Sequence, residues 1–207
     1  MLFQLIDRVL GSAPDPQKML LRERAKALRG QAHAGRPDAA RHAARHFLDA
    51  FFPGPEIQES DAIVALYAAK GTELSTHPLA DALHQKGIEI ALPVVEKQAR
   101  PLVFKRYTPG DKLAEGAFGI ETPTGEAPTM TPSLVVAPLL AFSRGGGRLG
   151  YGGGFYDRTL AKLRRAGPVT AIGYAYGAQE VDALPTGRLD EPLDWIVTER
   201  GAFRTGS

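Results

Sequence analysis

Cysteine is absent from this chain, which excludes several classes of site. No disulfide can crosslink the fold, no cysteine-based zinc site can form, and no thiol can serve as a nucleophile. Long apolar runs are absent too, since none reaches the roughly 18 uninterrupted residues of a membrane span. Asp7 and Arg8 interrupt the apolar N-terminal segment Met1–Gly11, unlike the uncharged core of a signal peptide. We therefore expect a cytoplasmic protein with no membrane partner.

Net charge is small as well. The 25 lysines and arginines exceed the 23 aspartates and glutamates by only two, and 43% of the 207 residues are hydrophobic. A chain of this size and composition can bury a substantial core, so it is not expected to be disordered. The sequence predicts one domain over residues 17–200, with an N-terminal extension (1–16) and a C-terminal tail (201–207).

Acidic residues are scarce between residues 18 and 46, where eight lysines and arginines are accompanied only by Glu23 and Asp38. Two interpretations remain open. The charges can cover solvated helix faces, or they can form an anion site for phosphate, carboxylate or nucleic acid. No aromatic side chain is interleaved with them, which argues against stacking on single-stranded nucleic acid.

Apolar runs alternate with helical patterns along the rest of the chain. Helices are predicted at about 17–34, 37–51, 79–86 and 156–165, and strands at about 62–67, 88–95, 102–107, 134–142, 169–174 and 195–198. Pro138 is expected to end or bend the strand over 134–142. Residues 108–132, rich in Gly, Pro and Thr, are expected to form one long connection. The alternation predicts an α/β fold of three layers, Rossmann-like, with helices on both faces of a mostly parallel sheet.

Glycine is the one residue type in surplus. Of 23 glycines, seven lie among the ten residues from Gly145 to Gly154, between a predicted strand and a predicted helix. Backbone N–H groups in such a loop can converge on a phosphate, whose charge the helix N-terminus favours. Arg148 and Arg158 add positive charge, and Asp157 can cap the helix or hold Mg²⁺ beside the phosphates. A flexible connection is the alternative interpretation.

Two familiar nucleotide-binding loops do not fit this cluster. It lacks the Gly-Lys-Ser/Thr of a Walker A loop, and no acidic ribose partner follows about 20 residues later, as a dinucleotide fingerprint requires. The sequence therefore predicts a phosphate loop of another kind.

The segment from Gly147 to Arg158, GRLGYGGGFYDR, resembles the signature of the 5-formyltetrahydrofolate cyclo-ligases, also called methenyltetrahydrofolate synthetases. The resemblance extends from about Lys18 to Glu199. Its further landmarks occur in order: Lys18 and Arg22 four residues apart, Glu73, Tyr107-Thr-Pro-Gly110, Phe118-Gly-Ile120, and Leu184-Pro185 before Asp190 and Asp194. The chain departs from the residues common in that family at Thr122, Ser133, Ser143 and Leu189.

The resemblance implies an enzyme that uses ATP and Mg²⁺ to convert 5-formyltetrahydrofolate, with or without a polyglutamate tail, into 5,10-methenyltetrahydrofolate. It implies ATP contacts from Lys18, Arg22, Arg148, Gly150, Tyr151, Gly152, Gly153, Gly154 and Tyr156. It implies that Arg148 and Asp157 are catalytic, that Arg22, Glu73, Tyr107 and Phe155 contact folate, and that Asp157 and Asp190 bind Mg²⁺. Ordinary core packing is the alternative for Tyr107 and Phe155.

The implied chemistry explains the need for ATP. A formamide oxygen is a poor leaving group, so ATP phosphorylates it before N10 attacks the same carbon and phosphate departs. Such a site must hold the γ-phosphate in line and neutralise its charge.

Two other hypotheses remain. The same domain also occurs in proteins that bind RNA, and the basic segment 18–45 would suit that role. The complete set of Lys18, Arg22, Glu73, Asp157 and Asp190 argues against a binding-only domain, so a nucleic-acid partner is not expected. A related enzyme acting on a different N-formyl substrate is the third hypothesis.

Overall fold

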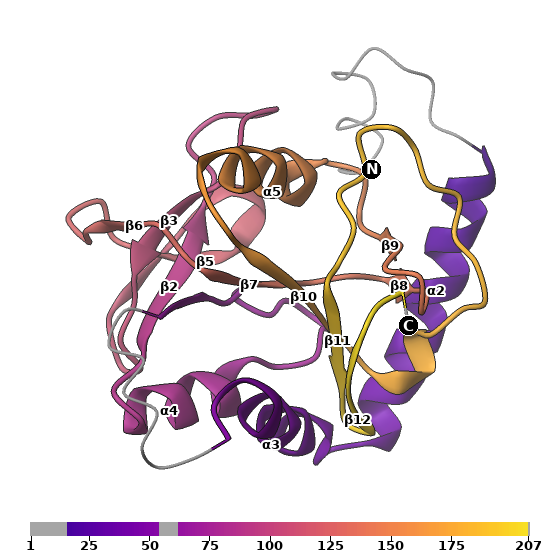
Figure 1. Ribbon diagram of the computed structural model, residues 1–207, viewed down its shortest axis with the longest axis horizontal. Helices are drawn as coiled ribbons and strands as arrows, with labels where there is room; N and C mark the ends of the chain where they lie inside the picture. Colours follow the sequence, from indigo (N-terminus) through magenta and orange to yellow (C-terminus); the bar gives the residue numbers. More distant parts are fainter. Residues whose placement is uncertain (1–15, 54–61, 207) are drawn as a thin grey trace.

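The centre of the sheet consists of parallel strands in the computed structural model, which describes residues 16–53 and 62–206 (Figure 1). These strands are β1 (Ile63–Ala65), β2 (Glu89–Val94), β7 (Leu134–Ala137), β10 (Thr170–Tyr174) and β11 (Trp195–Thr198). Antiparallel strands complete the eight-stranded sheet, with β12 (Gly201–Arg204) at one edge and β3 (Val103–Arg106) and β6 (Thr129–Met130) at the other. The predicted α/β fold with a mostly parallel sheet is confirmed.

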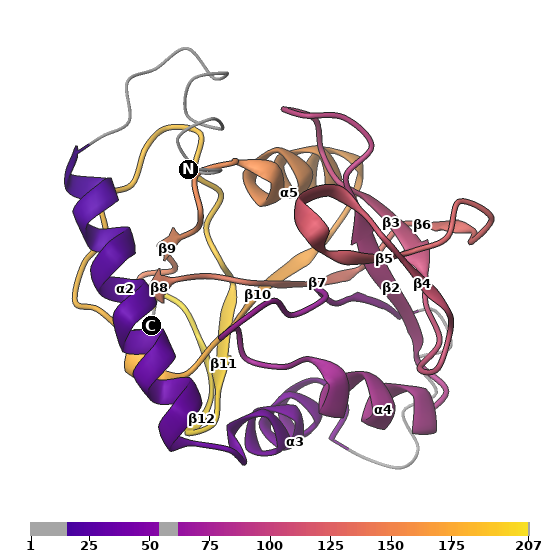
Figure 2. The same cartoon turned by 180° about the vertical axis from the view of Figure 1, so that it is seen from behind.

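Helices cover both faces of this sheet, as the two views in Figures 1 and 2 show. All four predicted helices are present: α2 (Pro16–Gly35), α3 (Ala39–Phe51), α4 (His77–Gln85) and α5 (Phe155–Ala166). α3 and α4 lie on one face and α5 on the other, while α2 runs along one side of the molecule. In the described part of the chain, no helix is long and apolar enough to cross a membrane. The predicted N-terminal extension lies outside the described residues, except for Pro16.

Each central strand divides its side chains between two cores, because successive residues of a strand point to opposite faces. Val64 and Leu66 join the core beneath α3 and α4, whereas Ala65 between them joins the core beneath α5. β7 alternates in the same way, with Val136 on the first side and Val135 on the second. A strand buried on both faces reads as a continuous apolar run, which is why these strands were predictable.

The apolar run 134–142 is not one strand. β7 ends at Ala137, Pro138 follows, and β8 (Ala141–Phe142) then pairs antiparallel with β9 (Arg148–Leu149). The expectation that Pro138 ends the strand is confirmed, because proline has no N–H to donate to a neighbouring strand. The chain leaves the sheet there and forms a separate hairpin.

Residues 108–132 are not the single irregular connection that was expected. They contain the antiparallel pair β4 (Leu113–Glu115) and β5 (Glu121–Pro123), the short helix η1 (Ala117–Gly119) between them, and β6. Neither β12 nor the short helix η2 (Gly177–Gln179) was predicted either. These elements are two to four residues long. Elements this short show too few alternations to be recognised from sequence.

Candidate functional site

The glycine cluster divides into two parts with different roles. Gly145–Gly147 form the turn between β8 and β9, where Gly146 has a φ of 88° and its carbonyl accepts the Leu193 N–H at 2.9 Å. A Cβ at Gly146 would lie 2.7 Å from the Leu193 carbonyl oxygen, so the turn requires glycine for close approach. Only Gly150–Gly154 connects β9 to the start of α5. The candidate phosphate loop is therefore this second part alone.

Two glycines in the Gly150–Gly154 loop adopt left-handed backbone conformations. Gly152 has a φ of 100°, and Gly154, the N-cap residue of α5, has a φ of 61°. Arg158, one turn into α5, donates from Nη2 to the Gly153 carbonyl at 2.6 Å. Its Nη1 would lie 2.7 Å from a Cβ at Gly154. Arg158 of α5 therefore supports the glycine loop that precedes this helix.

Replacing Gly154 by alanine is expected to lower the free energy of unfolding by roughly 1–2 kcal/mol, because an L-residue is strained in the left-handed region. The added methyl group would also displace Arg158. Urea unfolding measures the loss. Gly145→Ala is the matched control, since a Cβ there meets no described atom within 4 Å. If both variants lost the same free energy of unfolding, the left-handed conformation of Gly154 would not be the cause of the loss.

One face of α2 lies against the glycine loop. Arg22 donates from Nε to the Gly150 carbonyl at 3.1 Å, and Lys18 Nζ lies 3.4 Å from Asp190 Oδ2. One turn after Arg22, Ala25 is buried against Leu149 of β9 and Leu140, which precedes β8. Lys18, Arg22 and Ala25 follow the three- and four-residue spacing that places side chains on one helix face. The structure therefore brings Arg22 to the predicted loop and Lys18 to Asp190, a predicted magnesium ligand.

The cations of the basic segment between residues 18 and 46 divide between two locations. Arg22 and Arg29 contact the glycine loop, and Lys18 contacts Asp190. Other cations form ion pairs away from the loop, which join Lys26 to Glu23, Arg36 to Glu199 and Arg41 to Asp38.

Asp157 and Arg148 form an ion pair at the start of α5. Arg148 Nη2 donates to Asp157 Oδ1 at 2.5 Å, and the Arg148 side chain is only 6% exposed. Both residues also hold the backbone of Glu191: its N–H donates to Asp157 Oδ1 at 3.0 Å, and its carbonyl accepts from Arg148 Nη1 at 2.7 Å. Asp157 thus directs Oδ1 to Arg148 and Glu191, while Gly154 is the N-cap residue of α5. The contacts fix the segment that carries Asp190 beside the glycine loop.

Glu73 lies in the turn after β1, in a largely buried position with 9% of its side chain exposed. Its Oε2 accepts the Lys70 N–H at 2.8 Å, and its Oε1 lies 3.7 Å from Arg29 Nη1. Burial raises the pKa of Glu73, and the Lys70 N–H, the Arg29 charge and the Tyr151 hydroxyl oppose that rise. A buried carboxylate with these partners is a strong acceptor for a ligand N–H.

Aromatic side chains meet beside the loop. The rings of Phe155 and Phe118 pack edge to face with centroids 6.0 Å apart, and the Arg158 guanidinium lies 5.4 Å from the Phe155 centroid. Phe118 has a φ of 61°, a strained value for a residue with a bulky side chain, and its carbonyl accepts from Lys70 Nζ. The β4–β5 hairpin is thereby joined to the turn that carries Glu73.

Tyr107 lies apart from the other predicted folate contacts. It follows β3 and packs against the core beneath α3 and α4, with Asp81, Asp111 and Glu121 nearby. Among the described residues, no hydrogen bond or ring contact joins it to Glu73, Phe155 or the glycine loop.

Arg29 is the site residue that sequence reasoning missed. It lies 7 residues after Arg22 on the inward face of α2, and it contacts both Glu73 and Tyr151. Its signal was the spacing, since two helical turns separate it from Arg22 on the same face. Phe118 and Glu191 were also assigned no role, because backbone contacts and ring pairs between distant segments leave no local pattern.

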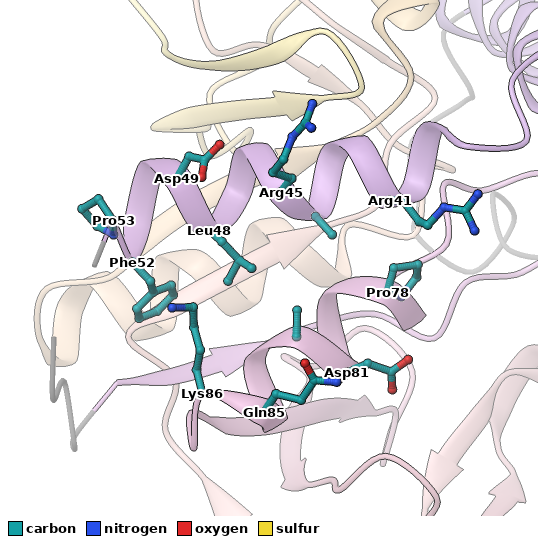
Figure 3. Close-up of a pocket in the computed structure, with 12 residues that line it drawn as sticks. Arg41, Arg45, Leu48, Asp49, Phe52, Pro53, Pro78, Asp81, Gln85 and Lys86 are labelled. Atoms are coloured by element: carbon teal, nitrogen blue, oxygen red, sulfur yellow. The ribbon is translucent and has the colours of Figure 1, made fainter. Parts of the chain in front are cut away.

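A groove of about 850 Å³ lies elsewhere, between α3 and α4 (Figure 3). Leu48 and Phe52 lie among charged side chains there, including Arg45 of α3, Asp81 of α4 and Lys86 just after α4. None of the predicted site residues lines it. The candidate site is instead the region between α2, the glycine loop and the Glu73 turn.

Comparisons with known proteins identify the family of this chain. The profile of the 5-formyltetrahydrofolate cyclo-ligase family matches residues 14–199. The 5-formyltetrahydrofolate cyclo-ligase of Escherichia coli is 36% identical over 140 residues, which cover 65% of this chain and 76% of that protein. The protein of the same name from Mycolicibacterium smegmatis is 31% identical over 172 residues, covering 79% of this chain and 86% of that protein.

The fold is similar to a solved structure as well. The 5,10-methenyltetrahydrofolate synthetase of Aquifex aeolicus superposes with a TM-score of 0.73 at 27% identity, covering 92% of this chain and 93% of that one. Sequence and fold therefore agree over most of both chains. This chain belongs to the 5-formyltetrahydrofolate cyclo-ligase family.

Proposed function

We propose that this protein uses ATP to close 5-formyltetrahydrofolate to 5,10-methenyltetrahydrofolate, releasing ADP and phosphate. The observation that carries the proposal is the Gly150–Gly154 loop at the N-terminus of α5, which Arg22 contacts and beside which Lys18 meets Asp190. A helix N-terminus preceded by glycines and faced by cations suits a polyphosphate. Family membership supplies the folate half of the reaction.

The nucleotide binds along the glycine loop. The backbone of Gly150, Gly152, Gly153 and Gly154 receives phosphate oxygens, flanked by Tyr151 and Tyr156, while Lys18, Arg22 and Arg148 offset their charge. Lys18 is one-quarter exposed and is paired with Asp190 only at 3.4 Å. An exposed pair of that kind is weak, so Lys18 can exchange Asp190 for a phosphate.

Asp157 and Asp190 are the residues that would hold Mg²⁺. In the described residues, no group of three or more His, Asp or Glu side chains is arranged to enclose a metal. A pair of carboxylates fits Mg²⁺ nevertheless, because this ion is commonly bound through one or two carboxylates together with waters and phosphate oxygens. Glu191 joins the two aspartates structurally, since it follows Asp190 and donates its N–H to Asp157.

Folate binds on the other side of the loop. The Glu73 carboxylate accepts from N–H groups of the pterin ring, Phe155 packs against that ring, and Arg22 lies between the two ligands. Tyr107, which packs against the core beneath α3 and α4, is also assigned to the folate.

ATP supplies the phosphoryl group that makes the formyl oxygen a leaving group. The remaining steps belong to the chain's own residues. The loop and its cations orient the γ-phosphate toward that oxygen and neutralise developing charge, while Glu73 fixes the pterin so that N10 lies near the formyl carbon. Arg148 holds the Asp157 carboxylate in a fixed orientation throughout.

Mixing the protein with 5-formyltetrahydrofolate and MgATP is expected to produce the methenyltetrahydrofolate chromophore together with ADP. Adding excess EDTA is expected to stop both. Absence of both products would contradict the proposal. Steeply salt-dependent RNA binding by the same preparation would then favour the RNA hypothesis.

A further inference from the structure

Arg29 is a buried cation at the meeting point of three segments. It belongs to α2, and its side chain is 7% exposed. Its Nε donates to Thr72 Oγ1 at 3.0 Å in the turn after β1, and its Nη1 donates to the Tyr151 hydroxyl at 2.6 Å in the glycine loop. The same Nη1 lies 3.7 Å from Glu73 Oε1. One guanidinium therefore contacts the proposed folate side and the proposed nucleotide side together.

Tyr151 contacts both Arg29 and Glu73 directly. Its hydroxyl accepts a hydrogen bond from Arg29 and donates one to the Glu73 carboxylate, and its ring centroid lies 5.6 Å from the Arg29 guanidinium carbon. Burial and the neighbouring Glu73 charge raise the pKa of Tyr151 to about 12, so this hydroxyl stays protonated and keeps donating. Arg29, Tyr151 and Glu73 form a closed set, which we term the Arg29 triad.

We propose that Arg29 is a positioning residue that holds Glu73 and Tyr151 in fixed relation, so that the folate and nucleotide subsites are organised as one unit. The inference rests on the proposed function, since it assigns Glu73 to folate and Tyr151 to the nucleotide loop. Arginine suits the role because its planar fork of donors can hold several acceptors at fixed angles, which a lysine ammonium cannot.

A purely structural role explains the triad less well. Burying a cation and a carboxylate together is costly, and such pairs are often no more stabilising than apolar residues of similar size. A coupling role makes a distinct prediction: occupancy of one subsite changes affinity at the other through the triad.

The first test is the coupling itself, measured on the full chain by calorimetry. The Kd for 5-formyltetrahydrofolate is determined with and without a non-hydrolysable MgATP analogue. In the wild type the analogue is expected to lower that Kd by roughly fivefold or more. Tyr151→Phe, which removes only the connecting hydroxyl, is expected to bring this ratio close to one.

The second test removes the charge. Arg29→Met is expected to raise the folate Kd by about tenfold or more, because Glu73 stays buried without its cation. Arg29→Lys is expected to recover part of the affinity but not the coupling ratio. Arg24→Met, an exposed arginine on the same helix, is the matched control and is expected to change neither value.

A pH series supplies a readout that loss of packing would not move. The charged and titratable groups facing Glu73 are Arg29 from α2, Lys70 from its own turn, Tyr151 and Tyr156 from the loop and α5, and Tyr67 after β1. Because the Arg29 charge lowers the pKa of Glu73, its removal raises that pKa further. Folate affinity in Arg29→Met should therefore begin to fall at a higher pH on acidification than in the wild type.

The outcomes separate the two proposals. A wild-type protein that neither binds nor converts 5-formyltetrahydrofolate contradicts the proposed function. A wild type that converts folate, with an unchanged coupling ratio in Tyr151→Phe, overturns the inference alone. Should Arg29→Met fail to fold, the Tyr151→Phe ratio decides the matter by itself.

Discussion

Replacing Asp157 by alanine is expected to reduce kcat for methenyltetrahydrofolate formation by about a thousandfold or more, because it removes a carboxylate from the point where phosphate charge must be neutralised. The same change frees Arg148 and the Glu191 N–H from the oxygen that holds them. A coupled absorbance and ADP assay measures the loss, and circular dichroism checks that the variant is folded.

Asp157→Asn tests the negative charge of Asp157 separately from its hydrogen bonds. The amide oxygen of asparagine can accept from both Arg148 and the Glu191 N–H, but it carries no negative charge for Mg²⁺. We expect this variant to match the wild type in urea unfolding and the alanine variant in activity. High activity in Asp157→Asn would remove the metal role assigned to this residue.

Arg148→Met is expected to have the second largest effect, with KM for ATP raised by about 10- to 100-fold and folate affinity changed far less. The free energy of unfolding should also fall by roughly 1–3 kcal/mol, because the Glu191 carbonyl and Asp157 both lose a buried donor. This loss in the free energy of unfolding is smaller than that expected for breaking a fully buried ion pair, since 24% of the Asp157 side chain is exposed to solvent.

The matched control is Arg144→Met, in the neighbouring hairpin turn. Arg144 is 67% exposed and pairs with Glu180, so its loss should leave both KM values unchanged and cost at most about 1 kcal/mol. If Arg144→Met raised KM for ATP as much as Arg148→Met, general positive charge rather than the buried pair would be responsible.

The parts of the fold that sequence predicted well are those whose energetics are local or repetitive. β7 and β10 are buried on both faces and read as apolar runs, and α3 shows its buried side as a helical stripe including Ala43 and Phe47. Pro138 ends β7 through a property of its own ring. The β4–β5 pair escaped prediction because partners found elsewhere in the chain, such as Lys70 contacting Phe118, stabilise it.

The site residues, too, were predictable from the sequence only where their pattern is local. The Gly150–Gly154 loop and Asp157 are adjacent in sequence, so their motif was visible. Arg29 was hidden among seven other lysines and arginines between residues 18 and 46. Arg29 is buried and Arg24 is exposed, and only the spacing from Arg22 along α2 distinguishes the two in the sequence. Gly145–Gly147 were grouped with the predicted phosphate loop, because composition alone cannot distinguish a hairpin turn from a phosphate loop.

The contacts between α2 and the rest of the site join residues far apart along the chain. Lys18 and Asp190 are separated by 172 positions, Arg22 and Gly150 by 128, and Arg29 and Tyr151 by 122. During synthesis α2 emerges long before the segments that it must meet, so a nascent chain has no competent site until nearly all of it has been made. Ligand binding is consequently linked to folding of the whole domain, and a nucleotide should raise the melting temperature of the entire cooperative unit.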